Sequence, residues 1–173
     1  MREVSPHLLL KRINVDLLDP FSPAFWIRVG TAILCGGLVG LERQVRGKPA
    51  GIRTSILICM GTQFFVLLGS GSFPENADPT RVLGQVVTGI GFLGAGVILT
   101  REGLVVGVTS AAVIWLLAAV GAMIGLGYLQ AALAVSFTTV GILVGVEYLE
   151  KTFRVLRRGM YELRSTLYTR DNG

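Results

Sequence analysis

The sequence predicts an all-α membrane protein: a polytopic bundle of five transmembrane helices, preceded by an interfacial amphipathic helix and followed by a basic cytoplasmic helix. Hydrophobic residues make up 51% of the 173-residue chain and charged residues only 16%, whereas soluble domains contain about 25% charged residues. The mean hydropathy is +0.64. In addition, five apolar stretches have lengths close to the roughly twenty residues that a helix needs to cross a bilayer.

The boundaries of the five spans follow from helix-start and turn signals. Ser22-Pro23 and Asp78-Pro79 each place a capping side chain before a proline, which is typical of a helix N-terminus. Gly127 predicts a tight turn between the last two spans, and Arg101-Glu102-Gly103 a short turn after the third. The predicted spans are 23–41, 52–69, 79–99, 108–126 and 128–146.

Three regions result: an interfacial N-terminal segment (1–22), a five-helix transmembrane domain (23–147) and a basic amphipathic C-terminal helix (148–173). The stretch from Ser5 to Asp19 is too short and too charged to span, so we expect it to lie along the membrane surface. In the C-terminal helix, apolar residues recur every three or four positions, with basic residues off that stripe. Binding to an anionic lipid surface is favoured over a short coiled coil or partner-docking helix, because the stripe covers fewer than three heptads.

The distribution of basic residues predicts the orientation. Eleven Lys and Arg residues fall in the 42–53 loop, at the Arg101 turn and in the tail, which share one side, and five fall on the other side. Cytoplasmic loops carry the excess of basic residues. We therefore expect the C-terminus in the cytoplasm and the N-terminus outside.

Polar residues within or beside the spans are the candidate pathway or gate, because ionisable groups at membrane depth are commonly functional. An ion pair between Glu42 and Arg53 would join the first two spans, either as a structural staple or as an inner gate. Gln85 and Thr88 lie one turn apart and could face a polar interior. Thr109 and Ser110 are placed to cap the fourth span. The candidate polar residues are Glu42, Arg43, Arg53, Thr54, Gln85, Thr88, Arg101 and Thr109.

Glycines are the second set of candidate residues. Small residues four apart let helices pack closely in lipid, and this spacing occurs in the first, fourth and fifth spans. The third span is richer still, and either packing, which is favoured, or a distorted helix lining a polar pathway would explain it. Its Gly-x-Gly-x-x-Gly match lacks the strand and acidic residue of a nucleotide site. The candidate packing or pathway glycines are Gly36, Gly40, Gly89, Gly91, Gly94, Gly96, Gly121, Gly125, Gly141 and Gly145.

Catalytic chemistry is not indicated. His7 is the only histidine, and Cys35 and Cys59 lie in apolar runs without metal-ligand spacing. The sequence therefore predicts no enzyme and no cofactor, and it identifies no metal ligands. The net charge of +5 is explained by cytoplasmic loops rather than by nucleic-acid binding.

Four blocks of sequence resemble the MgtC/SapB family. They are Gly-Gly-Leu-Val-Gly-Leu-Glu-Arg (36–43), Ala-Gly-Ile-Arg-Thr (50–54), Gly-Gln-Val-Val-Thr-Gly-Ile-Gly-Phe-Leu-Gly-Ala-Gly-Val-Ile (84–98) and Gly-Val-Thr-Ser-Ala-Ala-Val-Ile-Trp (107–115). The resemblance covers about residues 25–146. It implies a bacterial inner-membrane protein with an outward N-terminus and a link to growth at low magnesium; the family's namesake is thought to restrain the membrane ATP synthase. The namesake's Arg-Gly-Leu-Asn-Thr is Val-Gly-Val-Thr-Ser here (106–110).

Two functions remain open. The first is a non-enzymatic inner-membrane protein linked to magnesium or ion homeostasis or stress adaptation. It would act by helix–helix contact with itself, a dimer being favoured, or with another membrane protein such as an ATPase. The second is a small oligomeric ion transporter or channel that uses the glycine-rich third span.

Overall fold

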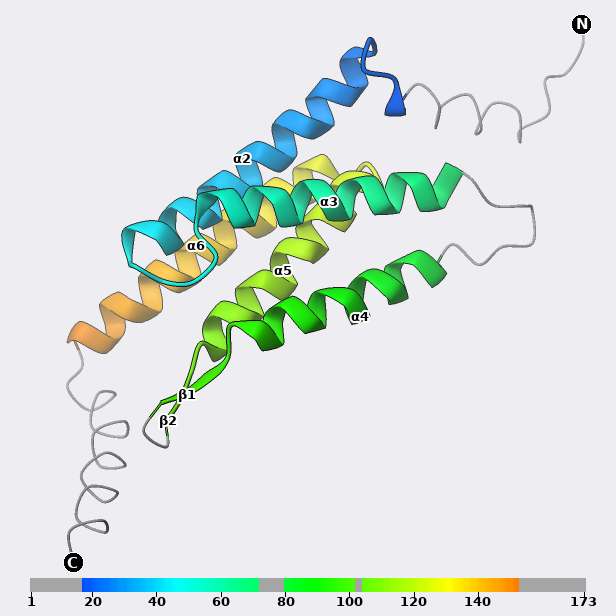
Figure 1. Cartoon of the computed structure of the whole chain (residues 1–173). Coiled ribbons are helices and arrows are strands. Elements are labelled where there is room, and N and C mark those ends of the chain that lie inside the picture. The colour runs from blue at the N-terminus through cyan, green and yellow to red at the C-terminus, as the bar shows by residue number, and fades with distance from the viewer. Residues whose placement is uncertain (1–16, 72–79, 102–103, 153–173) are drawn as a thin grey trace, which may run out of the picture. The chain divides into compact units, whose positions relative to one another are not determined.

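The computed structural model describes residues 17–71, 80–101 and 104–152, and within them five helices and one small hairpin (Figure 1). The all-helical prediction is therefore confirmed, with a hairpin that was not predicted. Most of the N-terminal segment and of the C-terminal helix lie outside the described residues. The elements are α2 (Pro23–Val45), α3 (Ile52–Gly71), α4 (Thr80–Gly96), β1 (Leu99–Arg101), β2 (Leu104–Val106), α5 (Val108–Gly125) and α6 (Leu129–Thr152).

The chain forms two compact units that divide within α6, after Phe137. The first unit contains α2 to α5, the hairpin and the beginning of α6. The second unit contains the rest of α6, including Gly141 and Gly145. The sites discussed below all lie in the first unit.

Helix α2 begins at the predicted signal. Ser22 is its N-cap, the Ser22 hydroxyl accepts a hydrogen bond from the Ala24 N–H (3.3 Å), and Pro23 occupies the first turn. After α2 the chain reverses through Gly47 and Ala50, which both adopt positive φ (61° and 60°). The Gln44 side chain of α2 accepts a hydrogen bond from the Ile52 N–H (3.3 Å) and so joins α2 to the start of α3.

Helices α2 and α3 pack with their backbones unusually close. A Cβ added at Gly36 would lie 2.7 Å from the Cα of Ile56, and one at Gly40 would lie 2.6 Å from the Cα of Ile52. No real side chain fits at such distances, because the obstructing atoms belong to backbone. The α2–α3 contact therefore depends on glycine at both positions.

Helix α5 approaches α3 in the same way, with a second pair of glycines. A Cβ at Gly121 would overlap the carbonyl of Cys59, and one at Gly125 would lie 2.9 Å from the carbonyl oxygen of Gln63. Helix α3 thus packs against both α2 and α5, and each of these two helices meets it with a Gly-x-x-x-Gly pair. This is the packing that membrane helices achieve with small residues.

Helix α4 is attached to the bundle near its two ends. Near its start, Val82 lies against Gly69 of α3. Near its end, a Cβ added at Gly94 would lie 3.7 Å from Ala111 of α5, an ordinary contact. The helix is continuous from Thr80 to Gly96, so the expected alternative of a distorted third span is not observed.

An antiparallel hairpin connects α4 to α5 where only a short turn was expected. Its strands pair Leu99 with Val106 and Arg101 with Leu104. Gly107 follows with φ +93° and lies against the carbonyl of Val97, so a side chain there would overlap the backbone. Glycine at this position lets the chain leave the hairpin and enter α5 at once.

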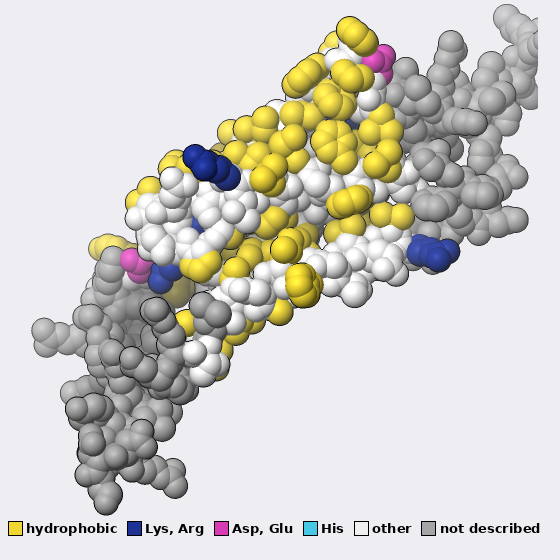
Figure 2. Space-filling view, in the orientation of Figure 1, with side chains coloured by type: hydrophobic (Ala, Val, Ile, Leu, Met, Phe, Trp, Pro, Cys, Tyr) yellow, Lys and Arg dark blue, Asp and Glu magenta, His cyan; other side chains and the backbone are white. Residues whose placement is uncertain are grey.

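Four of the described helices are long and apolar enough to cross a membrane: α2, α3, α5 and α6. Helix α4 has 17 residues, slightly less than the others. On the face shown in Figure 2, hydrophobic side chains cover the middle of α2, α3 and α4, and charged side chains lie toward the helix ends. The chain is thus a helical membrane protein with at least four candidate spans.

The close α2–α3 contact predicts a sharp difference between neighbouring glycines. Gly40→Ala should lower the free energy of unfolding by about 1–3 kcal/mol, because the new methyl group overpacks the contact. Gly37→Ala is the matched control, since a Cβ there would meet only the end of the Ile56 side chain at 3.8 Å. It should leave stability unchanged or raise it by up to about 1 kcal/mol.

Stability can be measured by thermal unfolding in detergent with a thiol-reactive dye, because Cys35 and Cys59 are both fully buried. Equal melting temperatures for Gly40→Ala and Gly37→Ala would contradict the packing described.

Candidate functional site

A buried arginine joins the end of α2 to the start of α5. Arg43 is 3% exposed, and its Nη2 donates a hydrogen bond of 2.6 Å to the hydroxyl of Ser110, which is also buried. The Nε of Arg43 is buried and has no hydrogen-bond partner within the part of the chain that the structure describes. Ser110 was expected to cap α5, but Gly107 is the N-cap, and no side chain caps that end. Thr109 is exposed.

Glu42 does not form the predicted pair with Arg53. Its Oε1 lies 2.7 Å from Nε of Arg46, one turn later on the same helix, whereas Arg53 and Thr54 are exposed. The local pair prevails because residues four apart on a helix are already neighbours. The second carboxylate oxygen, Oε2, is buried and has no hydrogen-bond partner in the described ranges. The predicted ion pair between Glu42 and Arg53 is therefore wrong, because Glu42 pairs with Arg46.

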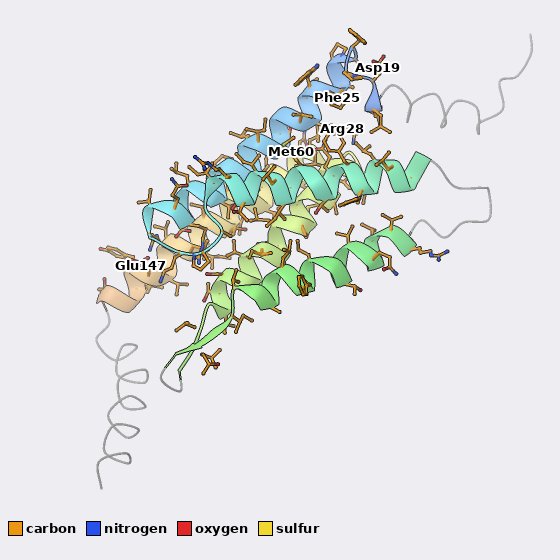
Figure 3. The ribbon with its side chains drawn as sticks, viewed as in Figure 1. Asp19, Phe25, Arg28, Met60 and Glu147 are labelled. Atoms are coloured by element: carbon orange, nitrogen blue, oxygen red, sulfur yellow. The ribbon has the colours of Figure 1, made fainter. Side chains whose placement is uncertain are left out.

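Arg28 binds the other end of α5, which the sequence did not predict. Its Nη1 donates to the carbonyl oxygens of Ile124 and Gly125, both at 2.7 Å. Figure 3 labels Arg28 on α2, one turn after Phe25. The last carbonyls of a helix lack partners within it and carry partial negative charge, so a guanidinium there is favourable. The sequence signal that could have indicated this contact was a lone arginine within an otherwise apolar span.

The two arginines together fix the register of α2 against α5. They are fifteen residues apart on α2, about 22 Å along a helix. Their partners, Ser110 and the Ile124 and Gly125 carbonyls, are separated by nearly the same number of residues on α5. Because antiparallel helices rise equally per residue, each arginine meets one end of α5.

Gln63 is a buried polar residue that sequence reasoning also missed. It is 1% exposed on α3, and neither its amide oxygen nor its amide nitrogen has a hydrogen-bond partner among the described residues. Its backbone carbonyl lies beside Gly125 of α5. A buried amide without partners is costly in an apolar interior, so this position is unusual.

A groove of about 920 Å³ runs between α3 and α4. Thr62, Phe65 and Leu68 line it from α3, and Arg81, Gln85 and Leu93 from α4. Gln85 is exposed on the groove, and Thr88 is exposed and donates its hydroxyl to the Gly84 carbonyl (3.0 Å). Neither residue lies in the bundle interior, contrary to the expectation of a polar interior. Arg101 ends β1, beyond α4.

The candidate glycines of the first unit fall into two classes. The glycines of α2 and α5 pack directly against α3, as described above. On α4, by contrast, a Cβ added at Gly84, Gly89, Gly91 or Gly96 would meet no described atom within 4 Å. Only Gly94 contacts a neighbouring helix.

The described residues contain no group of three or more His, Cys, Asp or Glu side chains able to hold a metal ion. The polar clusters are thus arginine-centred. Their chemistry is donation of hydrogen bonds from guanidinium groups, to a serine hydroxyl at one end and to helix carbonyls at the other.

Comparison with known proteins identifies the family. The model of the MgtC family matches residues 29–152, which include every described helix except the start of α2. The chain belongs to the MgtC family. In this MgtC-family chain, the blocks 36–43 and 107–115 that carry the resemblance meet at the Arg43–Ser110 hydrogen bond.

Relatives are found in several bacteria. YhiD of Escherichia coli (strain K12) is 41% identical over 150 residues, which are 83% of this chain and 68% of YhiD. Protein MgtC of Brucella abortus (strain 2308) is 43% identical over 133 residues, 76% of this chain and 56% of that protein. Protein MgtC of Salmonella typhimurium (strain LT2) is 45% identical over 106 residues, 61% and 45% respectively. The MgtC-family chain thus spans about half the length of these two MgtC proteins. No solved structure matches it significantly.

Proposed function

We propose that this MgtC-family chain is a non-enzymatic inner-membrane protein of magnesium or ion homeostasis that acts through helix–helix contact within the membrane. Family membership supports the role, and the Escherichia coli relative bears the name "Putative magnesium transporter YhiD". The observation that carries the mechanism is the open glycine face of α4.

Small residues form one continuous stripe along α4. Gly84, Thr88, Gly91 and Ala95 recur at intervals of four and three, so they share one helix face. All four are exposed, and the Thr88 hydroxyl is satisfied within the helix. Each glycine in a helix costs about 1 kcal/mol relative to alanine, a cost that close packing against another helix would offset.

The occupant we propose for this face is α4 of a second copy, giving a two-fold dimer. A stripe of small residues is complementary to another like itself, because two such faces bring backbones together without side-chain clashes. Phe92, 82% exposed, and Val87, 49% exposed, flank the stripe and would add apolar contact on either side. Another membrane protein, such as an ATPase, is the alternative occupant.

This proposal places α4 across the bilayer as the third of five spans, with the N-terminus outside and the C-terminus in the cytoplasm. The distribution of basic residues supports the orientation. Helix α4 with 17 residues measures about 25 Å, and the hairpin that follows it extends the crossing. The Arg43–Ser110 end of the bundle would then face the cytoplasm.

The α2 and α5 glycines cannot serve as the contact surface. Gly121 is pressed against α3, so a Gly121→Leu substitution would disrupt folding and would not report on association. The test therefore belongs on α4. Gly91→Leu should weaken self-association at least tenfold, because the leucine side chain holds the two backbones apart.

Association is measured by energy transfer between labelled copies in liposomes over a range of protein-to-lipid ratios. Gly30→Leu is the matched control: Gly30 is exposed on α2, and a Cβ there meets nothing within 4 Å among the described residues. Equal association of Gly91→Leu and Gly30→Leu, with both variants folded, would reject the α4 interface.

An oligomeric ion transporter is the second candidate, and Gln85 is the observation that favours it. This amide lines the α3–α4 groove together with Thr62. The continuous α4 helix weakens the candidate, since its backbone carbonyls are engaged in helix hydrogen bonds and are not free to coordinate ions.

Flux into liposomes distinguishes the two candidates. A transporter should show saturable uptake of Mg²⁺, K⁺, Na⁺ or H⁺ that Gln85→Leu abolishes, while Gly30→Leu retains it. Our proposal predicts no such uptake from folded protein.

A further inference from the structure

The groove between α3 and α4 has a polar end and an apolar body. Arg81 and Gln85, one turn apart, line it near the start of α4. Among the described residues that line the groove, Arg81 is the only charged one. Most of the remaining lining is apolar, and it includes Phe65, Leu68, Val82, Val86, Ile90 and Leu93.

The length of the groove along α4 corresponds to the depth of one membrane leaflet. Counted along the helix axis, Gln85 lies about 6 Å and Leu93 about 18 Å beyond Arg81. One leaflet, from its headgroups to the ends of its acyl chains, is about 20 Å deep. Under the proposed function, on which this inference rests, α4 crosses the bilayer and Arg81 lies at the outer interface. The groove then runs from the headgroup level to the middle of the membrane.

The groove is also wide, because α4 and α3 do not close it along its length. Val82 lies against Gly69 near the start of α4, but a Cβ added at Gly89 would meet no described atom within 4 Å. Phe65 of α3 and Leu93 of α4 remain 63% and 51% exposed. The volume of about 920 Å³ is near the upper end of the roughly 300–1,000 Å³ typical of ligand pockets. An acyl chain therefore has room between the two helices.

We propose that the α3–α4 groove binds an anionic phospholipid of the outer leaflet. The lipid phosphate accepts hydrogen bonds from the Arg81 guanidinium, whose planar fork suits phosphate oxygens. A glycerol ester carbonyl accepts a hydrogen bond from the Gln85 amide, and an acyl chain lies along the apolar lining. Phosphate, ester and hydrocarbon follow one another along the lipid in the same order as Arg81, Gln85 and the apolar lining along α4.

Charge complementarity favours a lipid over a protein helix as the occupant. A partner helix would cover the apolar lining equally well, but it would place an anion beside Arg81 only if it carried a carboxylate at that depth. A phospholipid always carries its phosphate at the interface, where basic residues beside membrane helices bind headgroups.

The lipid site and the proposed α4 dimer use different faces of one helix. Gly89 lines the groove, whereas Gly91 belongs to the small-residue stripe. Two residues correspond to slightly more than half a helical turn, so these glycines point to nearly opposite sides of α4. A dimer formed through the Gly91 face therefore leaves the groove open to lipid.

Native mass spectrometry of the purified protein in detergent, titrated with dioleoylphosphatidylglycerol, tests the headgroup contact. The wild-type protein should retain one lipid per chain, and Arg81→Gln should weaken this binding at least tenfold. Arg53→Gln is the matched control, because Arg53 is likewise exposed and the second residue of its helix but does not line the groove. It should change binding less than twofold.

A second variant tests the acyl-chain contact without changing any charge. Gly89→Leu places a side chain in the groove, so it should also weaken lipid binding at least tenfold. Gly30→Leu is its control, since a Cβ at Gly30 also has open space around it but lies on α2, away from the groove. Melting temperatures near that of the wild type would show that both leucine variants are folded.

Three results would overturn the proposal: no lipid retained by the folded wild-type protein, equal losses in Arg81→Gln and Arg53→Gln, or undiminished lipid binding by Gly89→Leu. In the last case, a loss of self-association in Gly89→Leu would assign the groove to a second copy. Lipid retention and the association measured with Gly91→Leu are separate readouts, so a failure of the lipid site is distinguishable from a failure of the α4 dimer.

Discussion

The close approach of α2 and α5 to α3 is the constraint on which the rest of the unit depends. Lipid provides no hydrophobic drive to bring one apolar helix against another, so contact must come from packing and hydrogen bonds. Gly36 and Gly40 on α2, and Gly121 and Gly125 on α5, remove the side chains that would hold these helices away from α3. Once the three helices are this close, the polar residues at their ends come within hydrogen-bond range.

The arginines of α2 use that proximity differently at each end of α5. Arg28 satisfies carbonyls that would otherwise face an apolar environment, so its role is explained by the fold. Arg43 meets the positive end of α5 through the Ser110 hydroxyl, and its Nε has no hydrogen-bond partner among the described residues. The same residue type on one helix thus meets helix ends of opposite sign.

Glycine likewise has two roles that share one sequence pattern. On α2 and α5 the glycines pack against α3 inside the unit, whereas on α4 most of them face outward. The helices themselves were predictable, because hydropathy and the Ser22-Pro23 and Gly127 signals act locally; α2 starts at the predicted residue, and Gly127 adopts φ +92°. Which way a glycine stripe points depends on helix rotation, which local spacing does not encode.

The polar contacts were less predictable for the same reason. Glu42 had two possible arginine partners for an ion pair. It pairs with Arg46, which lies on the same helix and is closer in sequence than Arg53. The Arg43–Ser110 and Arg28–Gly125 contacts join residues far apart in the chain, so only the arrangement of the helices reveals them. The hairpin before α5 was missed because its strands have only three residues each.

The proposed α4 interface requires that α4 crosses the membrane with its small-residue stripe toward lipid or a partner. Single cysteines introduced at exposed positions test this directly in intact bacteria with a membrane-impermeant maleimide, since buried Cys35 and Cys59 give little background. The account predicts labelling from outside at Phe21→Cys, Arg81→Cys and Tyr128→Cys, and protection of Lys48→Cys and Val105→Cys until the cells are opened. If Val105→Cys and Arg81→Cys were both labelled from outside, α4 would not cross, and the proposed interface would be contradicted.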